Sequence, residues 1–242
     1  QWDDSLLNLL ECPRSVLQYT VVKMDGRVAW GSVDYDSQGT GSMDNLDDYM
    51  YELRGVFGYD MPVSKKLRVT PFAGFGFRYL NNNLSGVSSS GALGYLRETY
   101  YYYIPLGVET RMNLKRGWSI NFSAEYDYFI DGTQKSHLGD AGLIQQDVNT
   151  LQWYSLDTAV NDQDKGYGIR GSLKLMKAGK RFDLFLEPFV RYWNIRESDP
   201  IQETSEQGAL RWYYNTTPPT PVEVVEPDNN STEYGLRMGI RF

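Results

Sequence analysis

The stretch Ser231 to Phe242, S-T-E-Y-G-L-R-M-G-I-R-F, decides the fold, because its side chains alternate in character along its length. One set of positions is mostly apolar or aromatic: Thr232, Tyr234, Leu236, Met238, Ile240 and Phe242. The other set carries charged residues and glycines: Glu233, Gly235, Arg237, Gly239 and Arg241. Successive side chains of a β-strand point to opposite faces, so this pattern predicts a strand with one apolar and one charged face. A soluble sandwich would bury the apolar face, whereas a membrane barrel turns it toward lipid and lines its interior with the polar face.

Six further segments repeat this alternation, and their lengths suit membrane strands of roughly 9–11 residues. They span residues 49–59, 67–79, 99–112, 118–130, 166–176 and 182–193. With the C-terminal stretch they make seven strands, and an even barrel needs one more. The best candidate is residues 28–36, V-A-W-G-S-V-D-Y-D. Residues 16–24 could instead form a hairpin with it through Asp25 and Gly26, and both arrangements stay open.

The connections between these segments alternate in length. Residues 62–66, 113–117 and 177–181 make tight, basic turns, and the stretches between them are long and polar, at residues 80–95, 131–162 and 197–229. Short turns at one end and long loops at the other are typical of outer-membrane barrels. We therefore predict an all-β, antiparallel, up-and-down transmembrane β-barrel of eight strands, with short periplasmic turns and long extracellular loops. The barrel covers residues 25–242, and residues 1–24 form an N-terminal segment that we leave unassigned.

The composition of the chain fits a barrel and argues against several other classes. Its 242 residues include 14% aromatic residues, and they contain no run of about 20 apolar residues that could cross a membrane as a helix. The net charge of -7 argues against a nucleic-acid partner. Cys12 is the only cysteine, which excludes a disulfide within the chain. No N-terminal stretch has the features of a secretion signal, so if the protein is exported we expect this to be the mature chain.

Three segments carry a resemblance to a known family. They are T-P-F-A-G-F-G-F-R-Y-L-N at residues 70–81, Y-Y-Y-I-P-L-G-V-E at residues 101–109, and the terminal Y-G-L-R-M-G-I-R-F. The chain resembles the small eight-stranded bacterial outer-membrane proteins of the OmpA-barrel and opacity-protein type. The resemblance implies a location in the outer membrane of a Gram-negative bacterium, in contact with membrane lipid and lipopolysaccharide. It also implies that Phe242 acts as the C-terminal signal to the barrel-assembly machinery.

The positions expected to face the interior carry a nearly balanced set of charges, nine basic and seven acidic: Glu52, Arg54, Arg68, Arg78, Glu109, Arg111, Glu125, Asp127, Arg170, Lys174, Asp183, Glu187, Arg191, Glu233, Arg237 and Arg241. A barrel of about eight strands is only wide enough to be filled by side chains. We therefore expect a packed interior in which arginines and carboxylates pair. Six glycines would make room for these pairs: Gly74, Gly76, Gly107, Gly168, Gly235 and Gly239. The alternative is a narrow channel for ions or small solutes, since bulky residues at further inward positions argue against a wide one: Tyr101, Tyr103, Phe185, Phe189 and Trp193.

Three prolines fall inside predicted strands, at Pro71, Pro105 and Pro188. Proline has no backbone N–H and so removes one hydrogen-bond donor from the ladder. We expect β-bulges or local bends at these positions.

We expect no catalytic residues, no cofactor and no metal site. The only histidine, His137, lies in a predicted loop beside Ser136 and Asp140. Neighbours in sequence do not make a catalytic triad, because the roles depend on geometry. A lipid-modifying outer-membrane enzyme is the less favoured alternative, and it would require His137 as its general base.

The predicted loops from residue 131 to 162 and from 197 to 229 are acidic and contain aromatic clusters: Trp153, Tyr154, Trp212, Tyr213 and Tyr214. Aromatic residues are enriched at protein interfaces. We therefore expect a structural protein, or one that binds an extracellular partner through these loops. A soluble, lipocalin-like barrel is the main alternative fold, but it would expose the apolar faces to water and bury the charged ones.

Overall fold

The computed structural model describes residues 19–37, 39–141, 144–146, 153–155, 158–201 and 225–241. These residues form β-strands, with two short 3-10 helices between them. The elements are β1 (Thr20–Ser37), β2 (Gly41–Tyr59), β3 (Met61–Pro62), β4 (Leu67–Val87), β5 (Leu93–Asn113), η2 (Lys115–Gly117), β6 (Trp118–His137), η3 (Leu138–Ala141), β7 (Ile144–Gln146), β8 (Trp153–Ser155), β9 (Thr158–Gln163), β10 (Gly166–Lys177), β11 (Asp183–Ile195) and β12 (Asn229–Arg241).

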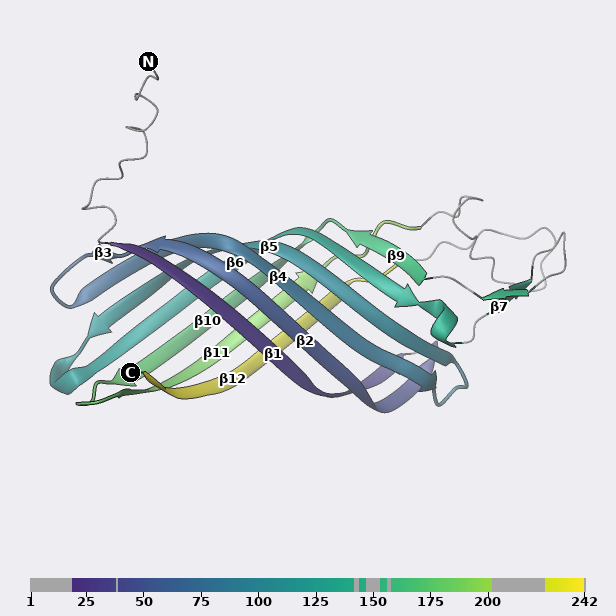
Figure 1. The fold of residues 1–242 in the computed structure, drawn as a ribbon, viewed down its shortest axis with the longest axis horizontal. Helices are drawn as coiled ribbons and strands as arrows, with labels where there is room; N and C mark the ends of the chain where they lie inside the picture. The colour runs from purple at the N-terminus through teal and green to yellow at the C-terminus, as the bar shows by residue number, and fades with distance from the viewer. Residues whose placement is uncertain are drawn as a thin grey trace, which may run out of the picture.

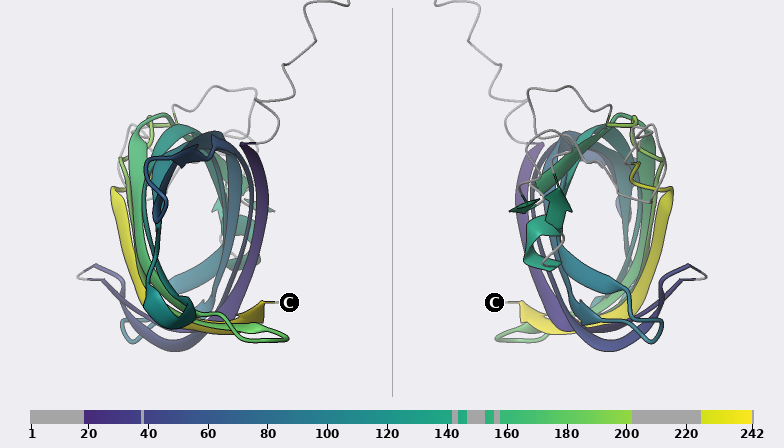
Figure 2. Two further views of the ribbon diagram at one scale, coloured as in Figure 1. Left: turned by 90° about the vertical axis from the view of Figure 1, so that its left-hand side faces the viewer. Right: turned by 90° about the vertical axis from the view of Figure 1, so that its right-hand side faces the viewer.

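Eight strands form one antiparallel sheet in the order β1-β2-β4-β5-β6-β10-β11-β12. The order follows the chain, so the sheet is an up-and-down meander, as predicted. It curls through 269° into an open half-barrel, with β1 (purple) and β12 (yellow) as its two edges (Figures 1 and 2). Short β3 pairs with β4, β9 pairs with the far end of β6, and β7 and β8 make a separate hairpin.

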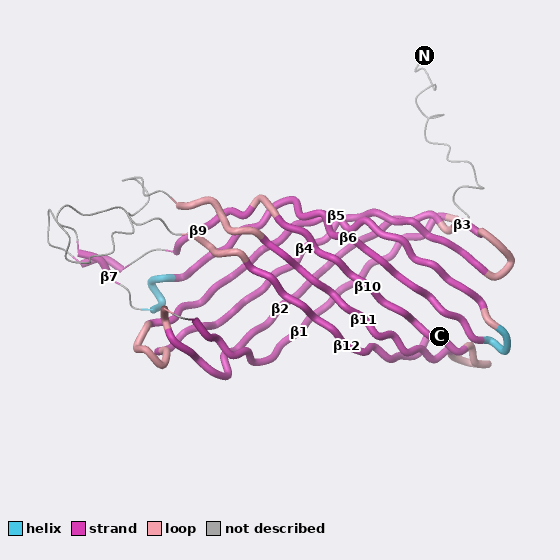
Figure 3. The backbone as a smooth tube through the Cα atoms, turned by 180° about the vertical axis from the view of Figure 1, so that it is seen from behind, coloured by secondary structure: helices cyan, strands magenta, loops and turns pink. Residues whose placement is uncertain are grey.

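The strand connections lie at two ends of the curled sheet. At the turn end, on the left of Figure 1, the short connections at residues 62–66, 113–117 and 177–181 are confirmed. Arg116 and Gly117 both adopt positive φ angles there, 59° and 74°, in the tight turn that includes η2. At the opposite, loop end, η3 follows β6, and Figure 3 shows η2 and η3 in cyan at opposite ends of the molecule.

Several strands extend further than the sequence predicted. β4 continues to Val87, β5 begins at Leu93, and β6 continues to His137, where β9 pairs with it. The prediction of a long loop at residues 80–95 is therefore wrong, as is the placement of residues 131–137 in a loop. The alternation used to find strands depends on apolar residues, and these extensions carry polar residues on both faces. Backbone pairing continues all the same.

The first strand, β1, decides between a continuous strand and a hairpin near the N-terminus. β1 runs unbroken through Asp25 and Gly26, which pair with Arg54 and Leu53 of β2. The hairpin alternative is therefore wrong, and the eighth strand begins at Thr20, inside the segment left unassigned. Asp-Gly is a common turn signal, but here its two residues simply continue the alternation of the strand.

The prolines interrupt hydrogen-bond ladders without shifting their register. The pairing of β4 with β5 omits the two pairs at Ile104 and Pro105 and then resumes in the same register. The pairing of β10 with β11 likewise skips two pairs at Pro188. The bulges that do shift register lie elsewhere, between Val33 and Tyr35, Asn83 and Gly86, and Tyr102 and Tyr103. The prediction of bulges at the prolines is therefore wrong, because a missing donor weakens one ladder without adding a residue to the strand.

The two faces of the sheet differ as strand alternation requires. Tyr101 and Tyr103 of β5 are buried on the concave face, whereas Tyr102 between them is exposed on the convex face. Convex tyrosines gather toward the loop end, where the Tyr79 ring centroid lies 4.8 Å from that of Tyr51 and 5.0 Å from that of Tyr100. The helices among the described residues are too short and too polar to span a membrane.

Candidate functional site: the charged concave face

Charged side chains from strands that are not neighbours meet across the concave face. Arg170 of β10 pairs with Glu52 of β2 at 2.6 Å, and Arg54 of β2 pairs with Glu125 of β6. Lys23 of β1 likewise pairs with Glu109 of β5. Strands this far apart in the sheet order can exchange such contacts only through the space that the curled sheet encloses. These pairs therefore define an interior.

Arg170 is the centre of this network. Its Nη2 donates to Glu52 Oε1 at 2.6 Å and its Nη1 to Glu52 Oε2 at 3.1 Å, a bidentate pair. Its Nε donates to Asp127 Oδ2 at 2.5 Å, and Nη2 also donates to the Tyr103 hydroxyl at 3.0 Å. All four side chains are buried. A guanidinium suits this position because its planar fork can serve two carboxylates at once.

Further ion pairs extend the network along the interior. Glu187 accepts from Lys174 at 3.0 Å and from Arg237 at 2.9 Å. Glu233 of β12 accepts from Arg191 at 2.9 Å, and it also pairs with Arg27 of β1. The second of these contacts joins the two edges of the sheet through side chains.

An aromatic cluster lies beside the Arg170 network and fills the interior there. It consists of Tyr101, Tyr103, Phe129, Trp193 and Ile195, with exposed fractions between 0% and 5%. The Arg170 guanidinium lies 5.2 Å from the Tyr103 ring centroid and 5.6 Å from that of Trp193. Arg78 lies 5.5 Å from the Trp193 ring centroid. Cations placed over aromatic faces in this way are attracted to the ring electrons, so charge and apolar packing support each other here.

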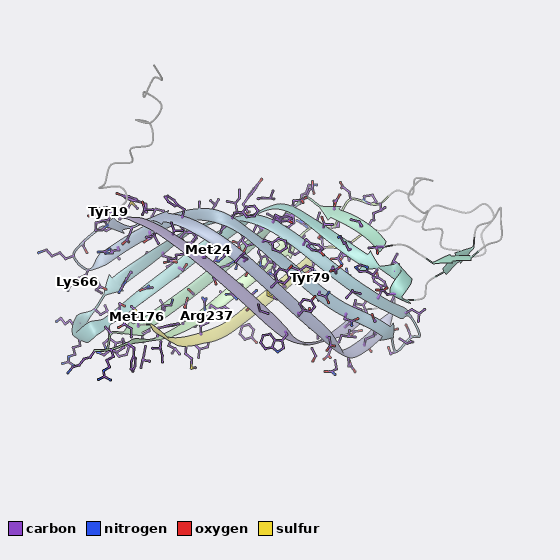
Figure 4. The ribbon with its side chains drawn as sticks, viewed as in Figure 1. Tyr19, Met24, Lys66, Tyr79, Met176 and Arg237 are labelled. Carbon is purple, nitrogen blue, oxygen red and sulfur yellow. The ribbon has the colours of Figure 1, made fainter. Side chains whose placement is uncertain are left out.

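A cavity of about 580 Å³ lies between this packed region and the turn end. Charged side chains dominate its lining: Lys23, Asp25, Arg54, Glu109, Lys174, Glu187 and Arg237. Figure 4 labels Arg237 on β12 and Met24 on β1, which both contribute to this lining from the sheet edges. The side chains thus leave a cavity near the turn end, whereas the aromatic cluster fills the interior further along.

Inward glycines make room chiefly for aromatic rings. A Cβ on Gly76 would lie 2.1 Å from the Tyr103 ring atom Cζ, so only glycine lets that ring cross its strand. The same arrangement recurs where inward glycines lie against inward phenylalanines, in the pairs Gly107 with Phe72, Gly235 with Phe189 and Gly239 with Phe185. At Gly168 the neighbour is the Asp127 carboxylate, at 2.8 Å from the added Cβ. The expectation that these glycines make room for charge pairs thus fits Gly168. The aromatic neighbours of the other four glycines were not predicted, because the position of a glycine in the sequence does not show which side chain packs against it.

Most of the predicted interior charges take part in this network, and a few lie apart from it. Arg68 is half-exposed and pairs with Asp60 at the turn end, while Asp183 Oδ1 accepts from the Gly179 backbone N–H. Arg111 lies on the concave side with its Nε buried. The Arg241 side chain lies outside the described residues.

Sequence reasoning missed three members on β1, namely Lys23, Asp25 and Arg27. They alternate with Val22, Met24, Gly26 and Val28, which is the same signal that identified the other strands. The Asp-Gly pair in this segment also allowed a hairpin, so residues 16–24 were left unassigned and their inward side chains were not counted.

The predicted loop and terminal residues lie mostly outside the described part of the chain. Trp153 and Tyr154 belong to β8, but nothing is described of their side chains, and Trp212, Tyr213, Tyr214 and Phe242 lie beyond the described ranges. His137 is described, and its predicted place in a loop is wrong. It is the last residue of β6 and pairs with Thr158 of β9.

The chemistry available on the concave face is ion pairing and hydrogen bonding. Within the described ranges, no group of three or more His, Cys, Asp or Glu side chains is arranged to hold a metal ion. No protein-family model matches the chain, and none of the curated proteins matches it.

Proposed function

We propose that the protein is an outer-membrane β-barrel of a Gram-negative bacterium, closed by pairing between β1 and β12, with a packed polar interior. Its role is structural, or it binds an extracellular partner through acidic loops that carry Trp153, Tyr154 and the 212–214 cluster. In this proposal lipid and lipopolysaccharide surround the barrel, and Phe242 engages the assembly machinery. The interior is a scaffold, without catalysis or a cofactor.

The observation that supports this proposal best is the inverted distribution of side chains over the two faces. The concave face holds mutually paired charges, whereas the convex face exposes large apolar residues on every long strand. On the edge strands Trp30 is 82% exposed and Tyr234 is 84% exposed. A soluble protein seldom leaves a continuous apolar surface of this kind in water, whereas membrane barrels require it.

Two further features support a membrane setting. The convex tyrosines toward the loop end form a band made of two groups of neighbouring rings. One lies around Tyr79, and the other includes Tyr167 and Tyr192, whose centroids are 6.0 Å apart. Trp118 lies at the turn end of the convex face, with its ring centroid 5.2 Å from Lys177 Nζ. Aromatic girdles at both boundaries of an apolar band are typical of outer-membrane barrels, since these rings favour the membrane interface.

Closure of the barrel would remove the unpaired backbone groups at the two sheet edges. The Arg27–Glu233 contact already holds the side chains of β1 and β12 together. A spanning sheet cannot leave backbone donors and acceptors unsatisfied in lipid, because each would cost several kcal/mol. The membrane therefore provides the drive for β1 to pair with β12.

Two measurements test this proposal. We expect the protein in the outer-membrane fraction, with a gel mobility that changes on boiling. β1 and β12 each have backbone amides that point away from the sheet along its free edge. We expect these edge amides to exchange hydrogen as slowly as the amides of β5 when the protein is in lipid vesicles. A water-soluble, heat-insensitive protein would refute the membrane location, and rapid exchange confined to β1 and β12 would refute closure.

A narrow channel is the second candidate, and the cavity of about 580 Å³ at the turn end favours it. The cavity would hold ions or small solutes near the turn end. Conduction through the barrel would also require the packed region of Arg170 and Trp193 to open. Single-channel recording in planar bilayers separates the two candidates. Discrete conductance steps with the unaltered protein would support the channel, and their absence would support a packed interior.

A further inference from the structure

A second cluster of reactive side chains lies on the convex face at the loop end, outside the interior network. Glu98 of β5, His137 of β6 and Thr158 of β9 come from three adjacent strands, since Glu98 pairs with Lys135 and His137 pairs with Thr158. Glu98 alternates with the inward Thr99 and Arg97, so it points outward with Tyr100 and Tyr102. The cluster thus lies just beyond the tyrosine band.

The three side chains are joined by two hydrogen bonds through the imidazole. His137 Nε2 lies 2.8 Å from Glu98 Oε2, and His137 Nδ1 lies 3.1 Å from Thr158 Oγ1. An ionised carboxylate can only accept, so Nε2 carries a proton; in the neutral imidazole Nδ1 then has a lone pair that accepts from the Thr158 hydroxyl. This is the order acid, imidazole, hydroxyl that activates a hydroxyl for attack on a carbonyl carbon.

The carboxylate that orients the imidazole is itself held in place. The Tyr79 hydroxyl donates to Glu98 Oε1 at 2.5 Å, and the Tyr100 hydroxyl donates to the same oxygen at 3.2 Å. Oε1 therefore accepts hydrogen bonds from the two tyrosines, while Oε2 accepts one from His137. A purely structural tyrosine band would not need a histidine between the carboxylate and an exposed hydroxyl.

The hydroxyl and a nearby cation are accessible from outside. Thr158 is exposed, and the His137 side chain retains 26% of its accessible surface. Lys135 points to the same face two residues before His137, with Nζ 5.1 Å from the Tyr100 ring centroid. In a reaction at Thr158, this charge would stabilise the oxyanion that forms on a bound carbonyl group. Ser136, the hydroxyl residue next to His137 in sequence, is buried on the opposite face and takes no part.

We propose that Glu98, His137 and Thr158 form an esterase site on the outer wall, with carboxylic esters of amphiphilic molecules as substrates. The choice of amphiphiles rests on the proposed function, because the cluster adjoins the tyrosine band at the boundary of the apolar surface. A substrate could leave its acyl chain beside the convex apolar side chains and present its ester at Thr158.

The reaction balances with water as the second reactant. Thr158 Oγ1 transfers its proton to His137 Nδ1 and bonds to the ester carbonyl carbon. The carbon–oxygen bond to the alcohol breaks, and the alcohol leaves with the proton from His137. Water then gives a proton to His137 and attacks the acyl-threonine, which releases the carboxylic acid and restores the Thr158 hydroxyl.

The test uses the full chain folded in detergent micelles, with p-nitrophenyl octanoate as the probe. We expect hydrolysis above the buffer rate, and we expect Thr158→Val and His137→Gln to lower kcat/KM by roughly 100-fold or more. Thr158→Ser keeps a hydroxyl and should retain activity. Thr133→Val on the convex face of β6 is the matched control and should leave the rate unchanged. Mass spectrometry after an acid quench should find the octanoyl group on Thr158.

Two results would overturn the site: hydrolysis that is equal in Thr158→Val and the unaltered protein, or no hydrolysis above the buffer rate. A boiled-versus-unboiled gel for every variant reports the fold independently of activity. Loss of the gel shift in the unaltered protein would refute the barrel, whereas an intact shift without hydrolysis would refute only the esterase site.

Discussion

Replacing Arg170 by methionine tests whether the interior is packed and dry. The substitution removes the charged guanidinium and leaves a shorter, unbranched apolar side chain in its place. It leaves Asp127, which is fully buried, without any ion pair among the described residues, while Glu52 keeps Arg27 at 3.4 Å. Removing one partner of a buried pair costs about 3–5 kcal/mol, because the remaining charge stays buried and uncompensated. We expect a loss of this size.

The companion substitution Asp127→Asn should cost less, about 1–3 kcal/mol, because Arg170 would keep both of its hydrogen bonds to Glu52. The double variant should lose less than the sum of the two single variants, because no uncompensated charge remains at this position. Urea unfolding in lipid vesicles, followed by tryptophan fluorescence, measures all three. Lys165→Met is the control, since its partner Asp164 is 65% exposed and the pair should contribute less than about 1 kcal/mol. A loss below about 1 kcal/mol for Arg170→Met would mean that water screens the interior, and the packed arrangement would be wrong.

Three further predictions follow from the interior contacts. Gly76→Ala should destabilise the protein by about 1–3 kcal/mol, because the added Cβ would clash with the Tyr103 ring. Gly55→Ala is the control and should not destabilise it, because its Cβ meets nothing within 4 Å. Equal urea midpoints for the two variants would contradict this prediction. Tyr103→Ala combined with Trp193→Ala should open a path through the aromatic cluster and produce conductance steps in planar bilayers, and a silent double variant would show that other side chains block the path. Glu233→Gln should weaken the contacts to Arg27 and Arg191 by about 1 kcal/mol and raise amide exchange in β1 and β12 roughly five-fold, with unchanged exchange counting against a role in closure.

Alternation along the chain was enough to place most interior side chains, because the period of two is a local property of any strand. It assigned Glu52, Arg170 and Glu187 to the face on which they lie. Alternation failed at Asp25 and Gly26, where the Asp-Gly pair also resembles a turn. It failed again where strands continue through polar residues toward Val87 and His137. The predicted bulges at the prolines were wrong for a different reason, because a missing backbone donor weakens one ladder without adding a residue to the strand.

The sequence by itself determined the central parts of most strands, their antiparallel order and the inversion of apolar and charged faces, since each depends on neighbours along the chain or on short turns. Only the tertiary structure decided which charges meet. Arg170 and Glu52 are 118 residues apart, and their pairing depends on how far the sheet curls and on the register of every strand between them. The cluster on the outer wall arises in the same way, because Glu98 and Thr158 reach His137 from 39 and 21 residues away. Register and curl depend on all the strands together, so no single segment of the sequence contains these contacts.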